Sequence, residues 1–382
     1  MTNNNHKSKS WLEISKTALL SNIKAITSLL PKDVSIMAVI KANAYGHGLK
    51  QVSSLLNRTD IEWFGVDSLE EALLISKQRT DLPILIMGYT LRKDLVSVIE
   101  NSFRQVVYDI ETLKVIESEA KGLNKKAYVH LKIETGTNRQ GIKLEDLETF
   151  ADFFVGNSYI VLEGIYTHFA DVEAGTGEFA AKQLAEYKKS VDIFAKRNIT
   201  IPLHHAAATS AILLLPETHF NLVRLGIGLY GLWPSREIKE KSVGADKKIG
   251  FMPVLQWKTI VAQIKMVKSG ESVGYGQSEC VRRDSTIAVI PQGYADGYDR
   301  KLSSCGEVLI RGERVKVLGR ICMNMFMVDI TDIGGVQVED EVVLIGTQGE
   351  EEITAEELAD KCDTINYEIV SRINPLIARI II

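Results

Sequence analysis

Short apolar runs alternate with longer amphipathic stretches from about residue 15 to residue 230. The runs are rich in β-branched residues, and the stretches between them have the apolar spacing of helices. The expected strands are Val34–Lys41, Trp63–Val66, Ile84–Gly88, Gln105–Tyr108, Tyr128–Ile133, Val161–Thr167, Pro202–Ala206 and Val223–Gly228. A strand followed by a helix, repeated along the chain, is typical of parallel βα units.

The stretches between these strands are long enough for right-handed helical crossovers. Examples are Leu69–Lys77, Asp94–Asn101, Leu144–Phe154 and Ala180–Lys196. Eight such units within about 200 to 250 residues favour an α/β fold of the TIM (β/α)8 barrel type, with an open doubly wound sheet as the alternative. In a TIM barrel the functional side chains lie at the carboxyl ends of the strands. Polar residues at those positions are therefore the first candidates for chemistry.

The pattern changes after Gly231. The stretch Leu232–Phe251 combines proline and glycine with many charges and is expected to be a linker. Apolar runs without helical stretches between them follow at Val254–Lys265, Thr286–Ile290, Glu307–Ile310, Arg314–Val317, Met325–Ile330 and Glu341–Ile345. They predict a mainly antiparallel β domain, closed by short helices at Thr354–Lys361 and Asn366–Arg372. We expect a flexible N-terminus at 1–10, a barrel at 11–240 and the β domain at 241–382.

Composition narrows the class of partner. The chain has 382 residues, a net charge of -4 and no cluster of basic residues, which argues against nucleic-acid binding and favours small molecules. It contains neither a signal peptide nor an apolar run of about 18 residues, so we expect a cytoplasmic protein that does not enter a membrane. Four cysteines without a CxxC pair, and histidines without zinc spacing, predict no metal site.

Lys41 is the most informative single residue. It follows the apolar run Met37–Ile40, where an ammonium taken out of water costs several kcal/mol unless it is paired or loses its proton. A neutral lysine is a nucleophile, and the commonest carbonyl cofactor held by a lysine as a Schiff base is pyridoxal phosphate. The alternative is a lysine whose end reaches solvent and has no chemical role.

Other polar residues fall at the ends of the expected barrel strands. Arg139 lies in a small-residue loop after the fifth strand and could bind a carboxylate, and His168 ends the sixth. Arg224 lies within the apolar eighth strand, where its charge needs a buried acceptor such as a pyridine nitrogen. Gly226 and Gly228 leave backbone N–H groups open to a phosphate, although a GxG pattern alone is weak evidence.

Four segments together resemble the bacterial alanine racemases, a family of fold-type III pyridoxal-phosphate enzymes with an N-terminal TIM barrel and a C-terminal β domain. The segments are Ala38–Gly48, Tyr166–Ala170, Gly293–Gly297 and Gly319–Met323. They occur in the family's order, and the resemblance runs from about Trp11 to the last helix. It implies a homodimer with shared active sites that interconverts L- and D-alanine and supplies D-alanine for peptidoglycan.

The resemblance also implies a role for individual residues. Lys41 matches the lysine that binds the cofactor and acts as one catalytic base, and Tyr275 matches the second base, which enters the partner's barrel. Residues that match the cofactor-binding positions are Tyr45, His168, Thr209, Ser210, Arg224, Gly226, Ile227 and Tyr367. Among these, Arg224 matches the arginine that bonds the pyridine nitrogen. His168 matches the residue that packs against the catalytic tyrosine.

Further matches concern the substrate. Arg139 and the Met323 N–H match the groups that hold its carboxylate, and Tyr294 matches a tyrosine at the entry channel. Lys132 matches a lysine that is carbamylated in many members and steadies that arginine.

Two positions depart from the family pattern. Asn324 stands where many members have an aspartate, which removes a charge and could loosen substrate choice. The phosphate-binding hydroxyl usually lies in an Asn-Ser-Ala run, whereas this chain reads Ala208-Thr209-Ser210-Ala211, and the sequence does not decide between Thr209 and Ser210. The competing hypotheses are a racemase of serine or of several amino acids, a non-catalytic pyridoxal-phosphate-binding barrel and a decarboxylase.

Overall fold

The structure, a computed structural model, describes residues 8–57, 59–78, 81–172, 177–243 and 249–382. The chain forms two compact units. The barrel unit consists of Ala18–Ala42 and Val52–Met252, and the β unit consists of the described residues up to Thr17, Asn43–Gln51 and Pro253–Ile382. Each unit is therefore built from separated pieces of chain, whereas the sequence analysis expected continuous segments at 11–240 and 241–382 after a flexible N-terminus at 1–10.

The barrel unit contains eight parallel strands in the order β8-β7-β6-β5-β4-β3-β2-β9. Their bounds are β2 Ser35–Val39, β3 Ile61–Val66, β4 Ile84–Ile86, β5 Arg104–Val107, β6 Ala127–Lys132, β7 Ile160–Tyr166, β8 Leu203–His205 and β9 Leu222–Leu225. A parallel bridge between Ala208 and Arg224 brings the two ends of this order together, so the sheet is a nearly closed barrel. All eight predicted strands and the TIM-barrel fold are confirmed.

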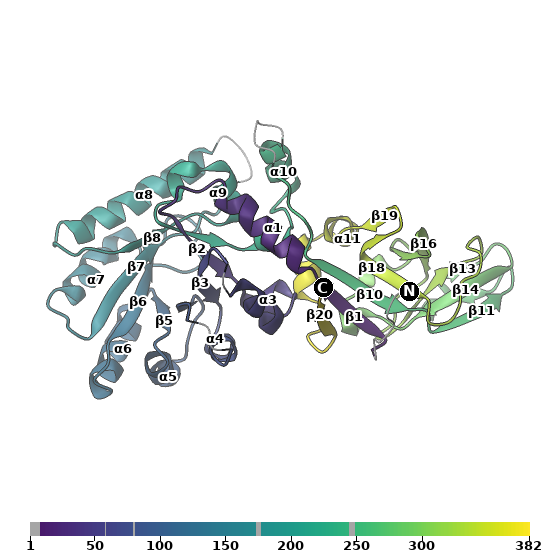
Figure 1. The fold of residues 1–382 in the computed structure, drawn as a ribbon, viewed down its shortest axis with the longest axis horizontal. Helices are drawn as coiled ribbons and strands as arrows, with labels where there is room; N and C mark the ends of the chain where they lie inside the picture. The colour runs from purple at the N-terminus through teal and green to yellow at the C-terminus, as the bar shows by residue number, and fades with distance from the viewer. Residues whose placement is uncertain (1–7, 58, 79–80, 173–176, 244–248) are drawn as a thin grey trace. The chain divides into compact units, whose positions relative to one another are not determined.

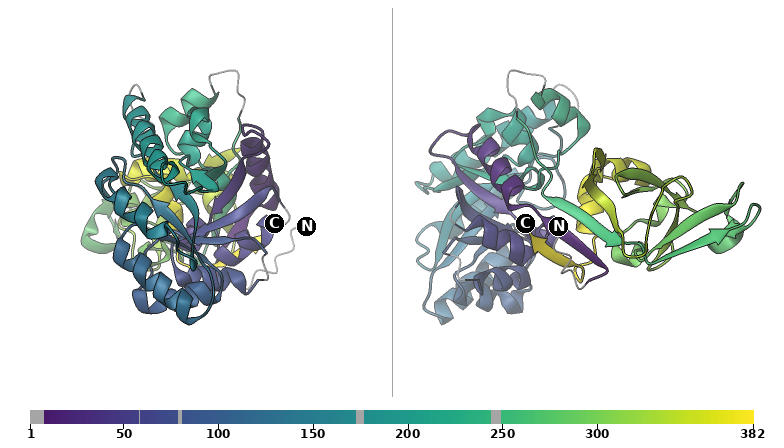
Figure 2. Two further views of the ribbon diagram at one scale, coloured as in Figure 1. Left: turned by 90° about the vertical axis from the view of Figure 1, so that its left-hand side faces the viewer. Right: turned by 45° about the vertical axis from the view of Figure 1, so that its right-hand side comes forward.

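Helices surround the barrel strands, as the left panel of Figure 2 shows. Those of the barrel crossovers are α4 Leu69–Ser76, α5 Leu95–Glu100, α6 Ile110–Gly122, α7 Leu147–Phe154 and α8 Glu178–Ala195. Side chains before them fix two of the starts, because Ser68 accepts the N–H of Glu71 and Asp109 accepts the N–H of Thr112. The four predicted helices are confirmed.

The remaining helices in the first 243 residues are α1 Lys16–Thr27, α2 Lys41–Tyr45, α3 Leu49–Leu56, α9 Thr209–Leu214 and α10 Arg236–Val243. The last of these contradicts the expected linker at Leu232–Phe251. Its first turn carries Glu237 and its last turn carries Lys241, charges that suit the helix dipole, and Ile238 is buried. The local charges were interpreted as a sign of a linker, but they are the exposed face of a helix.

Packing inside the barrel comes from side chains on six of its strands. Met37, Trp63, Leu85, Val106, Tyr166 and Leu222 form one buried cluster. Burial of apolar surface contributes roughly 25 cal/mol per Å² to the free energy of folding, so this cluster stabilises the barrel. It supports the polar residues at the carboxyl ends of the strands.

The β unit is mainly antiparallel, as expected. Its main sheet has the order β11-β14-β17-β16-β15-β18-β10-β1-β20, with β19 beside β18. The bounds are β1 Ser10–Ile14, β10 Leu255–Ile260, β11 Gln263–Val267, β14 Ser285–Ile290, β15 Glu307–Ile310, β16 Glu313–Leu318, β17 Phe326–Asp329, β18 Glu341–Gln348, β19 Glu351–Ile353 and β20 Ala378–Ile381. A separate pair consists of β12 Ser272–Val273 and β13 Glu279–Cys280, and the helices are α11 Ala355–Cys362 and α12 Asn366–Ser371.

Two details of this unit differ from the sequence analysis. The expected strand Val254–Lys265 is wrong as a single element, because β10 ends at Ile260 and β11 begins at Gln263. The strand β1 was not predicted, and it pairs antiparallel with β10 and parallel with β20 (Figure 1). These backbone ladders attach the start of the chain to its C-terminal end.

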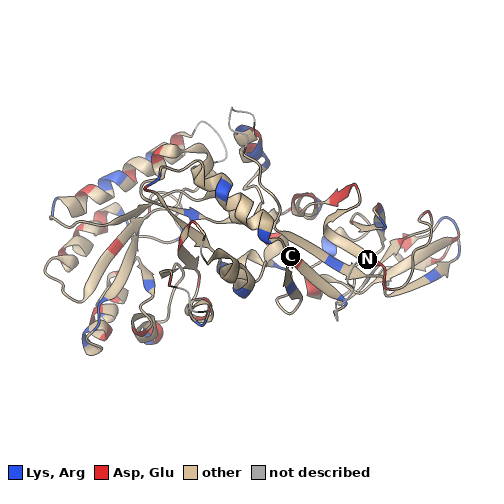
Figure 3. Cartoon of the chain, in the orientation of Figure 1, with Lys and Arg blue, Asp and Glu red and all other residues tan. Residues whose placement is uncertain are grey.

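The described residues include no helix that is long and apolar enough to cross a membrane. Basic and acidic residues are interspersed along the outer helices, as the blue and red segments of α8 show in Figure 3.

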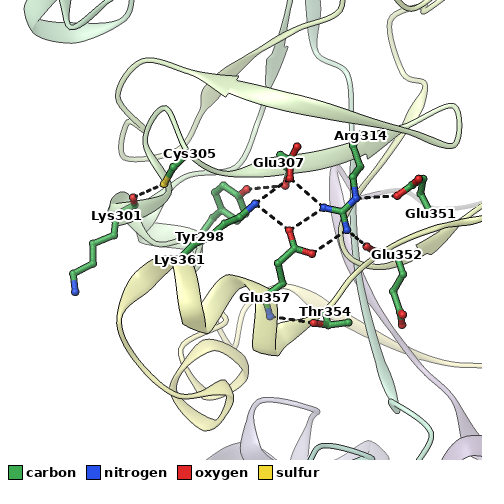
Figure 4. Close-up of polar contacts among 10 residues, drawn as sticks. All are labelled: Tyr298, Lys301, Cys305, Glu307, Arg314, Glu351, Glu352, Thr354, Glu357 and Lys361. Atoms are coloured by element: carbon green, nitrogen blue, oxygen red, sulfur yellow. Dashed lines mark hydrogen bonds and ion pairs between the residues drawn. The ribbon is translucent and has the colours of Figure 1, made fainter. Parts of the chain in front are cut away.

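Arg314 lies at the centre of an ion-pair network in the β unit (Figure 4). Its guanidinium contacts Glu307 on β15 at 3.1 Å, Glu351 on β19 at 2.8 Å and Glu357 on α11 at 2.9 Å. Lys361 contacts Glu307 and Glu357, each at 3.0 Å. The hydrogen bonds to Glu357 raise the pKa of Arg314. The network therefore ties α11 to two strands.

Replacing Arg314 with alanine should lower the free energy of unfolding by about 1 kcal/mol, since one guanidinium serves three partly exposed carboxylates. Added salt should shrink the difference because ions screen exposed charges. Urea denaturation measures both effects. The matched control is Arg283→Ala, whose pair with Asp332 lies on the surface and should change stability by less than half as much. Equal losses in the two variants would contradict the network's role.

Candidate active site

Arg224 is buried inside the barrel, at the third position of β9. Its Nη1 donates to the His205 carbonyl at 2.8 Å and to Nδ1 of His205 at 3.0 Å. Its Nη2 donates to the carbonyls of Thr167 at 2.8 Å and Ala206 at 3.0 Å and to Nδ1 of His168 at 3.3 Å. Among the described residues these bonds involve Nη1 and Nη2 only, so Nε–H is left as a donor. Burial lowers the pKa of Arg224 to about 10, and it remains a cation at neutral pH.

Lys41 follows β2 rather than ending it. The strand stops at Val39, and Lys41 begins the short helix α2 with its side chain 41% exposed. Its Nζ lies 3.5 Å from Oδ1 of Asp67, the residue directly after β3. The expectation of a lysine buried at the end of an apolar strand is therefore wrong in detail. Lys41 nevertheless follows β2, the neighbour of the strand β9 that carries Arg224, and the register of the two strands pairs Met37 with Arg224.

The residues after Lys41 have a left-handed backbone. Ala42, Asn43, Ala44 and Tyr45 have φ between 52° and 54°, and Gly46 follows at 82°. Left-handed helical conformation costs about 1 to 2 kcal/mol for each residue other than glycine. Four such residues in succession therefore require support from the surrounding structure, and strain of this kind gathers at functional sites.

Hydrogen bonds within the β unit supply that support. The Asn43 side chain accepts the N–H of Leu49 at 2.8 Å, and the His47 ring nitrogen Nδ1 donates to the Tyr45 carbonyl at 2.9 Å. Arg379 on β20 donates to the Gly46 carbonyl through Nε at 3.1 Å and Nη2 at 2.9 Å. These contacts hold the backbone that follows Lys41, and none of them was identified from the sequence.

Gly46 is needed at this turn for a second reason. A Cβ atom there would lie 1.9 Å from the Val370 carbonyl oxygen, in addition to requiring a positive φ. The same turn positions Tyr45, whose ring lies 6.1 Å from the ring of Tyr367 between centroids. Loss of solvation raises the pKa of Tyr45 to about 12, so its phenol keeps its proton and is a hydrogen-bond donor.

Lys132 lies at the end of β6 and is almost fully buried. Its Nζ donates to the Gln140 side chain at 3.0 Å, and the described residues offer it no carboxylate within ion-pair distance. Burial, and then the nearby guanidiniums of Arg139 and Arg224, lower the pKa of Lys132 to about 8. A buried amine with a lowered pKa is more reactive than an ordinary lysine, because a larger fraction of it is unprotonated near neutral pH.

Arg139 is exposed in the loop after β6, and Glu134 organises that loop. Desolvation raises the pKa of the Glu134 carboxyl, but backbone N–H groups of the loop, those of Asn138 and Gly136 foremost, lower it further than burial raises it. The bond from the Gly136 N–H measures 2.6 Å. Glu134 was not singled out from the sequence. Its place directly before the small residues 135–138 was the available signal.

His168 is neutral at physiological pH. Burial, followed by the charge of Arg224, lowers its pKa to about 3. Because Arg224 can only donate, Nδ1 of His168 accepts that bond and the ring proton lies on Nε2. His204, in the middle of the strand β8, bonds the Ile201 carbonyl at 3.0 Å.

The turn after β9 carries the candidate phosphate donors. Gly226 precedes the 3₁₀ helix Ile227–Tyr230, where the first N–H groups have no partner within the helix. The Gly228 N–H donates to the Thr209 hydroxyl at 3.3 Å, and a Cβ on Gly228 would lie 2.8 Å from Cγ2 of Thr209. Thr209 is thus packed on this turn, while Ser210 is the next residue of α9.

Tyr275 is 71% exposed in the β unit, in the 3₁₀ turn Tyr275–Gln277. Gly274 and Gly276 on either side have φ of 80° and 72°, so the turn needs glycine at both positions. Tyr294 and Met323 are also exposed, and their loops are joined by bonds from Tyr294 N–H to the Cys322 carbonyl and from Ala295 N–H to the Met323 carbonyl. The structure therefore places Tyr294 and Met323 together on one pair of loops.

Asn324 has a structural partner in the same loops. Its side-chain amide donates to Oδ2 of Asp296 at 3.3 Å, and that carboxylate oxygen also accepts the Gly293 N–H at 2.9 Å. An aspartate at position 324 would put two carboxylates against each other. Asparagine in place of aspartate at position 324 therefore removes a negative charge and avoids its repulsion by the Asp296 carboxylate.

The described residues contain no group of three or more His, Cys, Asp or Glu side chains that could hold a metal ion. The candidate site is instead rich in cations and hydrogen-bond donors, which suits an anionic ligand. Two groups of predicted residues emerge, one at the carboxyl end of the barrel strands and one in the β unit.

Comparisons with known proteins give the same family throughout. Residues 14–234 match the family profile described as "Alanine racemase, N-terminal domain", and residues 254–381 match "Alanine racemase, C-terminal domain". The chain is 39% identical over 370 residues to alanine racemase 1 of Caldanaerobacter subterraneus subsp. tengcongensis, covering 97% of this chain and 94% of that protein.

Two solved structures extend the comparison. The alanine racemase of Clostridium difficile 630 is 34% identical with a TM-score of 0.92, covering 99% of this chain and 97% of that one. The histidine racemase of Leuconostoc mesenteroides subsp. sake is 28% identical with a TM-score of 0.89, and each chain is covered completely. The same fold therefore occurs in racemases named for different amino acids.

The left-handed turn allows a test of its strain. Ala42 is exposed with φ of 52°, so glycine there should leave the free energy of unfolding within about 0.5 kcal/mol or raise it. The control is Ala185→Gly on the exposed face of the right-handed helix α8, which should cost about 1 kcal/mol. Urea denaturation compares the two variants. A loss at Ala42 as large as that at Ala185 would mean that the turn carries no strain.

Proposed function

The chain belongs to the alanine racemase family of isomerases, and from this we propose that it interconverts L- and D-alanine with pyridoxal 5'-phosphate as cofactor. The observation that carries the proposal is the pairing of strands β2 and β9, which brings a lysine and a buried arginine to one end of the barrel. The proposed role of the product, D-alanine for peptidoglycan, and a cytoplasmic location belong to the same hypothesis.

The residues present fit this cofactor. Arg224 has an unused Nε–H that can donate to a pyridine nitrogen, and Lys41 has an accessible amine that can bind an aldehyde. Phosphate oxygens need donors, which the turn at Gly226 and Ile227 and the hydroxyls of Thr209 or Ser210 would supply. Tyr45 and Tyr367, paired in the β unit, are the proposed phenol donors. When bound, the cofactor's conjugated ring stabilises negative charge at the substrate Cα.

Arg224 would also limit which reactions follow. An arginine with a pKa of about 10 keeps its proton and donates a hydrogen bond without transferring the proton. Arg224 would therefore leave the pyridine nitrogen of a bound cofactor unprotonated, and the cofactor would withdraw charge less strongly than beside an acid. This moderate withdrawal favours returning a proton to Cα over side reactions such as transamination.

Racemisation needs a base on each face of Cα. We assign one face to Lys41 and the other to Tyr275 of a second copy of this chain. The high exposure of Tyr275 supports this division, since a proton-transfer group must be shielded from water to be effective. His168 carries its proton on Nε2 and is the neutral donor proposed to stabilise the phenolate form of that tyrosine.

A homodimer with shared sites follows from the same assignment. The proposal rests on the exposed loops of the β unit, in which Tyr275, Tyr294 and Met323 present large side chains to solvent. In the dimer the Met323 N–H and Arg139 would hold the substrate carboxylate, and Tyr294 would line the entry.

Alanine is the preferred substrate in this proposal, because the aromatic ring of Tyr367 would narrow the site. A racemase for other amino acids is the second candidate, favoured by Asn324 and by the likeness to a histidine racemase. Substrates that differ by about one methyl group differ in binding free energy by only about 1 to 3 kcal/mol. The preference must therefore be decided by comparing kcat/KM among substrates.

Racemisation of alanine, serine and histidine, followed by circular dichroism, tests the activity and its preference. We expect the highest kcat/KM for alanine, and serine or histidine at or above alanine would overturn that assignment. Tyr275→Phe should lower kcat by at least about a hundredfold, since the phenol proton is lost. Tyr159→Phe, at the amino end of β7, is the control and should leave the rate unchanged. A Tyr275→Phe variant with the parent's kcat would contradict the two-base mechanism.

Lys132 is proposed to be carbamylated. The neutral amine adds CO₂ to form N–COO⁻ and releases one proton, which converts a buried cation into an anion that can pair with Arg139. A pKa of about 8, against 10.5 for an ordinary lysine, makes the neutral amine available near neutral pH. Native mass spectrometry should show the added CO₂ when bicarbonate is present, with loss on acidification.

Lys132→Ala should raise KM for alanine and regain affinity with added acetate, which can replace the carboxylate. The control is Lys125→Ala, whose exposed amine bonds the Glu100 carbonyl outside the site. An unmodified Lys132 together with full activity would contradict this assignment.

A further inference from the structure

A chain of buried hydrogen bonds runs from Arg224 through the barrel interior. Nη1 of Arg224 lies 3.0 Å from Nδ1 of His205, and Nε2 of His205 lies 2.9 Å from Nδ1 of His130. Nε2 of His130 lies 3.3 Å from Oε2 of Glu163 on β7. The Glu163 carboxylate is held in turn by Arg104, through Nε at 3.0 Å and Nη2 at 3.2 Å. Three strands, β8, β6 and β7, thus contribute one residue each between the guanidiniums of Arg224 on β9 and Arg104 on β5.

The direction of every bond in this chain is determined by its ends. A guanidinium has donors only, so Nδ1 of His205 must be an acceptor and the proton of a neutral His205 lies on Nε2. That N–H donates to Nδ1 of His130, which leaves the His130 proton on Nε2, facing Glu163. Glu163 is an acceptor at the other end, because Arg104 also donates to it. All partners are satisfied with both histidines neutral and in the Nε2–H form.

Any other protonation state breaks a bond. A doubly protonated His205 would point an N–H at the N–H of Arg224. A doubly protonated His130 would force the His205 proton onto Nδ1, with the same conflict. Burial lowers the pKa of both histidines, which agrees with the neutral forms.

Packing leaves these rings little freedom. Both histidines are fully buried, and the His205 ring stacks on Tyr166 at 4.6 Å with 7° between the planes. Gly164 stands beside His130, where a Cβ atom would lie 2.4 Å from Nδ1. Arg104 is itself held over the rings of Trp63 at 5.4 Å and Tyr128 at 4.9 Å. Because the two imidazole rings cannot turn away, a change of protonation or hydrogen bonding at Glu163 affects the bond that His205 makes to Arg224.

Charge explains why this series of hydrogen bonds includes the Glu163 carboxylate. Arg224 is a buried cation whose partners are all carbonyls or neutral ring nitrogens, and a charge buried in this way is costly without compensation. Glu163 supplies the one negative charge among these five residues: it pairs directly with Arg104 and is linked to Arg224 through two imidazoles whose ring planes are 64° apart. Arg104 keeps Glu163 ionised, since the hydrogen bonds from His130 and Arg104 outweigh the desolvation that raises its pKa.

We propose that Glu163 and His130 are positioning residues for Arg224. They lock His205 as the Nε2–H tautomer, so that its Nδ1 accepts from Nη1 and the guanidinium is held with Nε–H directed to its ligand. The role toward the cofactor rests on the proposed function, but the proton arrangement does not. Neither residue touches the candidate ligand donors, and both lie deeper along the strands than the site.

The proton arrangement can be measured directly. Two-bond ¹H–¹⁵N correlation spectra of the full-length protein, labelled at histidine and recorded with and without added pyridoxal phosphate, distinguish the two tautomers and the imidazolium. We expect neutral Nε2–H signals for His130 and His205 across the neutral pH range. Signals are assigned by replacing the other histidines one at a time. An Nδ1–H or imidazolium signal from either ring overturns the proposal, whether or not the cofactor binds.

Glu163→Gln tests the link to the ligand. A carboxamide has one oxygen where Glu163 has two, so it cannot accept from His130 and from both Nε and Nη2 of Arg104, and its NH₂ would face a donor; the tautomers should therefore become mixed. The Kd for pyridoxal phosphate, measured by absorbance, should rise about tenfold. This is the size of effect typical of groups that orient a ligating residue from behind. Glu148→Gln is the control, because it removes a carboxylate from the surface pair with Arg197 on the same barrel.

The two hypotheses fail differently. Tight binding and unmixed tautomers in Glu163→Gln would overturn the positioning role while leaving the racemase proposal intact. Absence of cofactor binding in the parent protein would overturn the proposed function, and the spectra of the parent would still decide the proton arrangement. A Glu163→Gln variant that does not fold leaves that measurement on the parent as the deciding test.

Discussion

The burial of the Arg224 guanidinium is the constraint on which the site depends. A permanent cation inside a barrel must be surrounded by acceptors, and here the acceptors are backbone carbonyls at the ends of two other strands and two neutral imidazoles. Satisfying Nη1 and Nη2 in this way leaves Nε as the remaining donor. The arginine therefore sets both the protonation of its neighbours and the direction in which it can bind a ligand.

A second constraint acts on the lysine of the neighbouring strand. Lys41 is followed by four residues in the left-handed region, a conformation that the chain would not adopt alone. Asn43, His47 and Arg379 hold this turn by hydrogen bonds to its backbone and to the residues that follow. The strain is thus offset by contacts to β20, so the last strand of the chain stabilises the backbone beside the first candidate catalytic residue.

Much of the fold was predictable because its determinants are local. Each barrel strand is a short β-branched or apolar run, and the structure has a strand at each of the eight predicted places. The errors arose where local signals were weak. Helix α10 is charged enough to resemble a linker, and β1 becomes a strand only because β10 and β20 pair with it. Pairing partners more than 200 residues away leave no mark on a short stretch of sequence.

The sequence by itself determined which residue types stand at the strand ends and, by resemblance, which family they belong to. Lys41 and His168 could be named because they follow apolar runs, Arg139 because it lies in a small-residue loop after one, and Arg224 because it interrupts one. Only the tertiary structure decided what surrounds them. Glu163 and His130 lie within strands and look like ordinary interior positions along the chain, yet the barrel brings them into line with Arg224. The reason is physical: a hydrogen-bond chain needs angles and distances across four strands, and these exist only once the sheet has closed.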